Sequence, residues 1–264
     1  MGWGPDPMPP PQPVAPPRLP GESAKGVPLA QQGRVGLDTA SFLNTEGNRA
    51  ATSFNVQATV PVADHTFVEA IMPLSLVYPW GNPTIGAHHV ARVAKPFWIT
   101  GGGSLGIPLI EDNNFIAQSI PRGLWNAHHH VHDILPLQAR LGLEYHVSIV
   151  QLRAHLEPSL WIPIAGNDDV HGAFYHAAEI QLGHTVGGGL RLQGVAYGPD
   201  YGSLSRSGLT GGSDHYQFAL SPFFVVHRDI GFLRLGVLMP MDEGLGPPFE
   251  ESWGFLFATG INLD

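Results

Sequence analysis

From Gln32 to its end the chain alternates apolar and polar residues with a period of two, which predicts β-strands. The final stretch, WGFLFATGINLD, is typical: Trp253, Phe255 and Phe257 share one face, and the residues between them are mostly small or polar. Successive side chains of a strand point to opposite sides of a sheet. The apolar face of this strand therefore needs either a packed core or a lipid layer.

Clusters of Gly, Pro, Asn and Asp divide this region, and no long stretch keeps a helical period. The divisions predict twelve strands, at 33–43, 50–61, 66–77, 83–94, 97–108, 137–147, 150–162, 172–184, 188–198, 215–227, 231–241 and 252–263. The connections alternate in length. Those expected to be tight are 63–65, 94–96, 148–150, 186–189 and 227–231, and the longer ones are 44–49, 78–83, 109–136, 163–171, 199–214 and 242–251. Short turns at one end and long loops at the other are typical of a transmembrane β-barrel.

The first residues differ from the rest of the chain. Residues 1–31 are dense in proline without hydrophobic periodicity, so we expect an extended tail ahead of a barrel domain over 32–264. The tail is either a linker or, over residues 1–28, a segment that docks on a periplasmic or envelope protein or threads into the barrel. It lacks the apolar core of a secretory signal, so an exported protein is expected to have lost its leader already.

Composition narrows the class. Charged residues make up 13% of the chain, about half of the typical share, and lysine occurs only at Lys25 and Lys95. The formal net charge of −9 argues against nucleic acid as a partner. The absence of cysteine excludes disulfides and thiolate metal sites, and no uninterrupted apolar run is long enough for a transmembrane helix. No cofactor-binding motif is found; the glycines of WITGGGSLGIPL lack the Lys-Ser/Thr of a phosphate loop.

The choice between a soluble and a membrane barrel depends on which face points inward. The polar faces carry single Arg and Glu residues between small side chains and no lysine, which favours a polar interior and a lipid-facing exterior. The charged residues expected to line the pore are Arg34, Asp38, Glu69, Arg92, Arg140, Glu144, Arg153, Glu157, Glu179, Arg191 and Arg234. Their near-neutral sum suggests a lumen cross-linked by Arg–carboxylate pairs. An ordinary solvated strand face is the alternative.

Most of the remaining charge falls in the longer connections and is acidic. The acidic residues there are Glu46, Glu111, Asp112, Asp133, Asp168, Asp169, Asp200, Asp214, Asp242, Glu243, Glu250 and Glu251. They are either an acidic rim that attracts cations or ordinary soluble loops.

From these patterns the region from Gln32 to Asp264 resembles a Gram-negative outer-membrane β-barrel protein and is similar in kind to the small porin-like barrels. The resemblance implies a location in the outer membrane among its lipids, and a role as a narrow pore or substrate channel, or as a barrel plugged by its own side chains. Such proteins typically finish with an aromatic residue that is recognised during insertion. Here the last aromatic is Phe257 and the chain ends in Asp264, so this signal is expected further inward.

A histidine cluster lies in the longest connection. His128, His129, His130 and His132 follow a segment that could form a short helix, which would bring His128 and His132 onto one face. We expect a constriction loop that narrows the lumen; a metal site and a solvated loop are the alternatives, and we assign no metal.

Two further functions remain open. His146 and Ser148 resemble the His-x-Ser pair of outer-membrane lipid hydrolases, but Ile149 and Val150 follow where those enzymes have Asn-Gly or similar residues, and we expect both side chains in the lumen. We therefore do not predict an enzyme. A structural or assembly barrel that binds an envelope partner through its tail is the other alternative.

Overall fold

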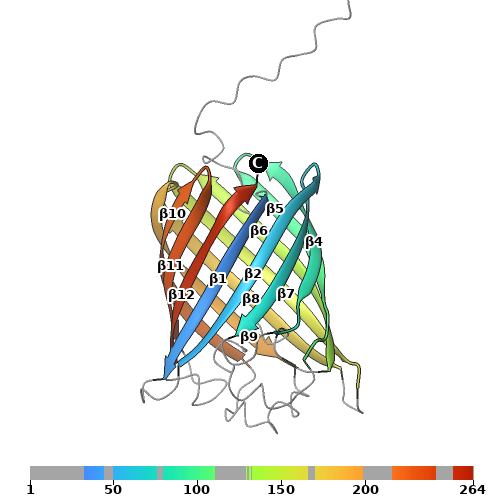
Figure 1. Cartoon of the computed structure of the whole chain (residues 1–264). Coiled ribbons are helices and arrows are strands. Elements are labelled where there is room, and N and C mark those ends of the chain that lie inside the picture. Colours follow the sequence, from blue (N-terminus) through green and yellow to red (C-terminus); the bar gives the residue numbers. More distant parts are fainter. Residues whose placement is uncertain are drawn as a thin grey trace, which may run out of the picture.

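The computed structural model describes residues 33–44, 50–75, 80–110, 129, 131, 133–165, 170–198, 216–241 and 252–263. These residues form a closed antiparallel barrel (Figure 1). Its strands are β1 (Gly33–Asn44), β2 (Ala50–Ala63), β3 (Thr66–Ser75), β4 (Thr84–Ala94), β5 (Phe97–Gly106), β6 (Ile134–Val147), β7 (Val150–Pro163), β8 (His171–Leu182), β9 (Val186–Tyr197), β10 (Tyr216–Arg228), β11 (Gly231–Pro240) and β12 (Ser252–Leu263). The predicted fold class and all twelve predicted strands are confirmed. The proline-rich tail lies outside the described residues.

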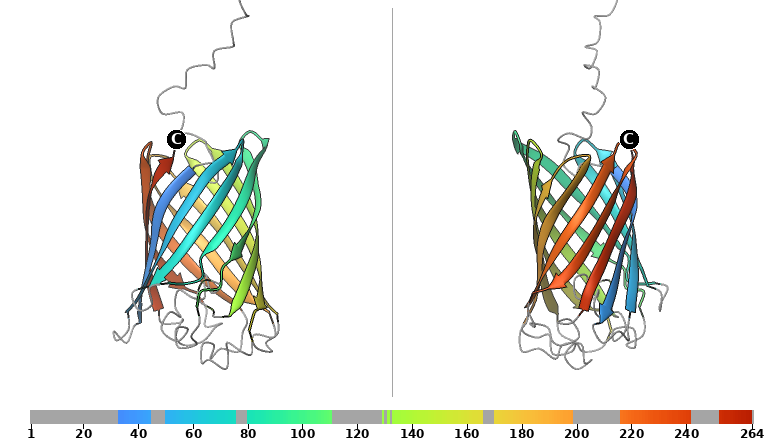
Figure 2. Two further views of the ribbon diagram at one scale, coloured as in Figure 1. Left: turned by 45° about the vertical axis from the view of Figure 1, so that its right-hand side comes forward. Right: turned by 90° about the vertical axis from the view of Figure 1, so that its left-hand side faces the viewer.

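Each strand pairs with its neighbours in the sequence, and the first strand closes the barrel on the last (Figure 2). The seam between β1 and β12 runs without a break from the pair Gly33 and Leu263 to the pair Asn44 and Ser252. A closed sheet has no edge strand, so every strand finds hydrogen-bond partners on both sides.

The tight turns gather at one end of the barrel, where the last strand also finishes (Figure 1). They lie at 64–65, 95–96, 148–149, 183–185 and 229–230. One predicted turn was wrong: residues 186–189 belong to β9, and the turn comes earlier, where Gly183 has a φ of 96°. Glycine adopts that left-handed conformation without steric cost, and the run of glycines after it obscured the true turn.

The outer face of the barrel is apolar. On β6, Leu141, Leu143 and Tyr145 are exposed, while the intervening Glu144 and His146 are buried. The strands from β7 to β12 expose apolar residues in the same way: Leu152, Leu156, Ile180, Leu190, Leu192, Phe224, Leu235, Phe255 and Ile261. Apolar side chains outside and charged ones inside are the arrangement of a membrane barrel, and a soluble barrel has the opposite. Among the described residues no helix is long and apolar enough to cross a membrane.

Glycine at inward positions lets strands and inner side chains approach closely. A Cβ atom on Gly102 of β5 would lie 2.4 Å from the carbonyl oxygen of Ala87 and 2.6 Å from the Cβ of His88. The glycine run of β5 therefore serves close packing within a small barrel, as its sequence suggested.

The lipid-facing assignment predicts depth-dependent costs. Leu141 lies at the middle of β6 with 55% of its surface exposed, so Leu141→Arg should lower the free energy of unfolding by about 2–4 kcal/mol in lipid vesicles. Val147→Arg, at the turn end of the same face, should cost at most about 1 kcal/mol. Urea unfolding followed by tryptophan fluorescence measures both. Equal costs would contradict burial of this face in a bilayer.

Candidate functional site

One group of ion pairs joins three strands inside the barrel. Arg140 of β6 donates through Nη1 to both carboxylate oxygens of Glu69 on β3, at 2.8 and 2.7 Å. Its Nε donates to Glu157 of β7 at 2.8 Å. Since β4 and β5 separate β3 from β6 in the wall, Arg140 and Glu69 meet by crossing part of the lumen. The guanidinium has several N–H donors in one plane, so a single arginine can serve two carboxylates.

A second group is centred on Glu179 of β8. One of its oxygens accepts from Arg153 of β7 at 2.6 Å, and the other accepts from Arg234 of β11 at 2.8 Å. Arg153 also lies 3.7 Å from Glu144, which contacts His146 at 3.2 Å. Two strands, β9 and β10, separate β8 from β11, so this bridge crosses the lumen too. The Glu179 side chain is 8% exposed, and it is compensated by two guanidinium groups.

Two inner arginines lack such partners. In the described part of the chain, neither Arg34 of β1 nor Arg191 of β9 forms an ion pair. The Arg34 guanidinium lies 5.7 Å from the ring centre of Phe232. Arg191 contacts the ring of His155 at 3.3 Å, and its buried Nε finds no hydrogen-bond partner among the residues that the structure describes.

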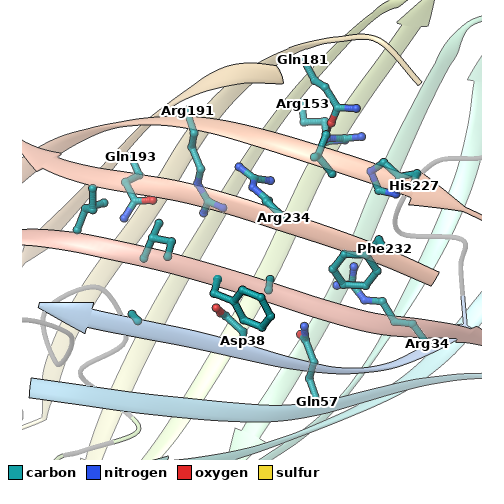
Figure 3. Close-up of a pocket in the computed structure, with 16 residues that line it drawn as sticks. Arg34, Asp38, Gln57, Arg153, Gln181, Arg191, Gln193, His227, Phe232 and Arg234 are labelled. Carbon is teal, nitrogen blue, oxygen red and sulfur yellow. Dashed lines mark hydrogen bonds between the residues drawn. The ribbon is translucent and has the colours of Figure 1, made fainter. Parts of the chain in front are cut away.

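The inner arginines line two cavities in the lumen. One cavity, of about 320 Å³, is bounded by β1, β2 and β7–β12 (Figure 3). The other, of about 250 Å³, reaches the first ion-pair group. Four of the eleven candidate residues line both cavities, and they are Arg34, Arg153, Arg191 and Arg234. Asp38 lines only the larger cavity, whereas Glu69, Arg140, Glu144, Glu157 and Glu179 line only the smaller one.

Arg92 differs from the other candidates. It is exposed near the turn end of β4, borders neither cavity, and lies 5.3 Å from the ring centre of Trp98. The alternation along the strand predicts that Arg92 faces inward, but it does not predict how close to the end of the barrel the residue lies.

Apolar side chains also occur inside the barrel. Near the end of the barrel opposite the tight turns, Ala40, Ala219 and Leu238 form a buried cluster, and Leu256 packs against it. Leu238 and Leu256 also line the larger cavity. At the turn end Phe67, Val90 and Trp98 form another cluster. Sequence reasoning treated the inner face as polar and missed these clusters, although the inward parity of residues such as Leu238 and Leu256 was available as a signal.

Of the four histidines predicted to form the constriction loop, the structure describes His129. Its carbonyl oxygen accepts from the backbone N–H of Asn82 at 2.8 Å, and its ring Nδ1 lies 3.0 Å from the Asn82 carbonyl. The Asn82 side chain, which is fully buried, donates to Val131 at 2.6 Å and accepts from the N–H groups of Leu109 and Ile110. Asn82 therefore ties the segment before β6 to the end of β5 and the start of β4.

The other loop residues with candidate roles lie mainly outside the described residues. These are His128, His130, His132 and the acidic loop residues apart from Asp133. Within the described residues no group of three or more His, Asp or Glu could hold a metal ion. Asn82 was missed in the sequence because an asparagine before Pro83 is typical of a turn.

The geometry of a lipid hydrolase is not found at His146 and Ser148. His146 faces the interior and contacts Glu144. The expected inward position of Ser148 was wrong: it lies exposed in the turn after β6, with a φ of 51°. The change of parity places the turn there, so the serine leaves the strand before it can share a face with the histidine.

Comparison with known proteins agrees on the fold. The barrel superposes on the COG4313 outer membrane channel from Pseudomonas putida F1 with a TM-score of 0.60 and 8% identity, covering 91% of this chain and 98% of that one. It superposes on the NanC porin with a TM-score of 0.57 and 5% identity, covering 86% and 99%. No protein-family model matches the sequence, and no curated protein matches it.

The closed barrel, its apolar exterior and these structural neighbours define the class. The chain is a transmembrane β-barrel with the fold of Gram-negative outer-membrane channels and porins, as the resemblance of its sequence implied. The similarity in sequence is too low to carry more than the fold.

The Glu179 bridge makes a prediction about stability. Glu179→Gln removes the shared carboxylate and leaves Arg234 without its ion pair, so the free energy of unfolding should fall by about 3 kcal/mol. Glu157→Gln should cost only about 1 kcal/mol, because Arg140 keeps both bonds to Glu69. Urea unfolding in lipid vesicles compares the two. A cost for Glu179→Gln no larger than that for Glu157→Gln would show that the bridge contributes little.

Proposed function

We propose that this barrel is a narrow outer-membrane pore or substrate channel whose lumen is divided by paired charges. The observation that carries the proposal is the pair of cavities, about 320 and 250 Å³, which lie inside the closed wall and share four arginines. A barrel of this strand number encloses more space than the packed eight-stranded barrels and less than the large porins. Its structural neighbours are described as an outer membrane channel and a porin, which supports the same function.

The paired charges in this proposal narrow the passage without filling it. The bridges from Arg140 to Glu69 and from Arg234 to Glu179 cross part of the lumen, and these residues also line the cavities. A charged solute or ion that passes would exchange its water shell for these fixed groups. Arg34, Asp38, Glu144, Arg153, Glu157 and Arg191 complete the proposed pore lining. Arg92, at the turn end, belongs to the entrance.

The bridge between Arg140 and Glu69 predicts a change in conductance. The double variant Arg140→Ala with Glu69→Ala removes one charge of each sign and widens the passage, so its single-channel conductance in planar bilayers should exceed that of the wild type. Arg228→Gln, on an exposed residue at a turn, should leave the conductance unchanged. Absence of current in the wild type and in the double variant would refute the pore and favour a structural barrel.

The segment that contains His129 forms part of the proposal as a constriction at the loop end. Asn82→Ala should release this segment by removing three hydrogen bonds, so the current should become larger or fluctuate more. Asn262→Ala is the matched control, because Asn262 makes its side-chain hydrogen bonds at the opposite end of the barrel. Identical currents in the wild type and in Asn82→Ala would remove the constriction from the proposal.

A further inference from the structure

The larger lumen cavity has an excess of positive charge. Of the residues that the structure describes, four arginines and one acidic residue, Asp38, line it. Arg153 and Arg234 are held by Glu179, whereas Arg34 and Arg191 form no ion pair in the described part of the chain. Figure 3 shows Arg234 between Arg191 and Arg34, with the Arg34 guanidinium beside the ring of Phe232.

Arg191 carries a buried positive charge that needs compensation. An arginine remains charged in proteins, and a buried charge needs an opposite charge or hydrogen bonds to replace water. Among the described residues its Nε has no hydrogen-bond partner, and the group that Nη2 contacts is an imidazole rather than a carboxylate. A bound anion would supply the missing acceptor oxygens, and a carboxylate fits the guanidinium fork in a bidentate manner.

The cavity also has an apolar part. Leu238, Leu256 and Val225 line it, and Leu238 is 2% exposed. Gln57, Gln181 and Gln193 add amide groups that can donate or accept hydrogen bonds. A volume of about 320 Å³ falls within the size range of small-molecule sites. An inorganic anion would use the arginines and leave the apolar wall without a contact.

From this geometry we infer that the cavity binds an organic carboxylate with an apolar body, its carboxylate on Arg191 and its hydrocarbon against Leu238 and Leu256. The inference deepens the proposed function and rests on it for transport, since it names the class of solute that the channel recognises. Binding itself does not require the barrel to conduct.

The test uses hexanoate as the probe, hexanamide as its uncharged analogue and acetate as an anion without an apolar body. Isothermal titration calorimetry on the purified full chain in detergent should show hexanoate binding, acetate binding at least about tenfold weaker, and no binding of hexanamide. In planar bilayers, hexanoate should reduce the current at concentrations where hexanamide does not.

Variants separate the two sides of the site. Arg191→Gln should weaken hexanoate binding about tenfold, because it removes a charge-assisted contact. Leu256→Asn should reduce the preference for hexanoate over acetate. Arg228→Gln, which lies at a turn, should bind as the wild type does, and far-UV circular dichroism should show that every variant keeps its strands.

Each contrary result has a distinct meaning. Equal binding of hexanoate by the wild type and Arg191→Gln, or equal binding of hexanoate and hexanamide, would overturn the site. Equal affinity for acetate and hexanoate would overturn the ligand class. Calorimetric binding without any current would refute the channel while supporting the site, and a current that hexanoate does not affect, without calorimetric binding, would do the reverse.

Discussion

The structure depends on one constraint: within hydrocarbon every backbone N–H and C=O group must find its partner in the protein. A sheet meets this requirement only if it closes, and the unbroken pairing of β1 with β12 completes the closure. Closure then separates the two faces of every strand. One face of each strand contacts lipid and the other lines the interior. The alternation of the sequence therefore places apolar side chains outside and polar ones inside.

The interior has to compensate the charges that it encloses. Arg140 and Glu179 do so by bridging strands that are not neighbours in the wall, and each serves two opposite charges. The compensation is uneven, because Arg34 and Arg191 form no ion pair in the described part of the chain and apolar side chains line the same cavity. Because the positive charge is uneven, the lumen can select solutes by their charge as well as by their size.

Much of the fold could be predicted because its signals are local. The parity of Leu141 and Leu143 against Glu144 and His146, and the change of parity at the following turn, can be read within a short stretch. Which arginine meets which carboxylate could not be predicted, since the contact of Arg140 with Glu69 depends on how far the strands tilt and shift around the barrel. The role of Asn82 was hidden for the same reason: its partners are brought to it by the closed wall.

The seam between β1 and β12 also bears on the order of events during folding. The two strands that it joins stand at opposite ends of the described chain, which is the largest separation that two strands of the barrel can have. The chain must lose the entropy of closing this long loop before contacts between β1 and β12 can stabilise the barrel. Until the last strand arrives, the partly formed sheet carries two open edges that could pair with another chain, so completion of the barrel is a late and cooperative step that requires protection of those edges.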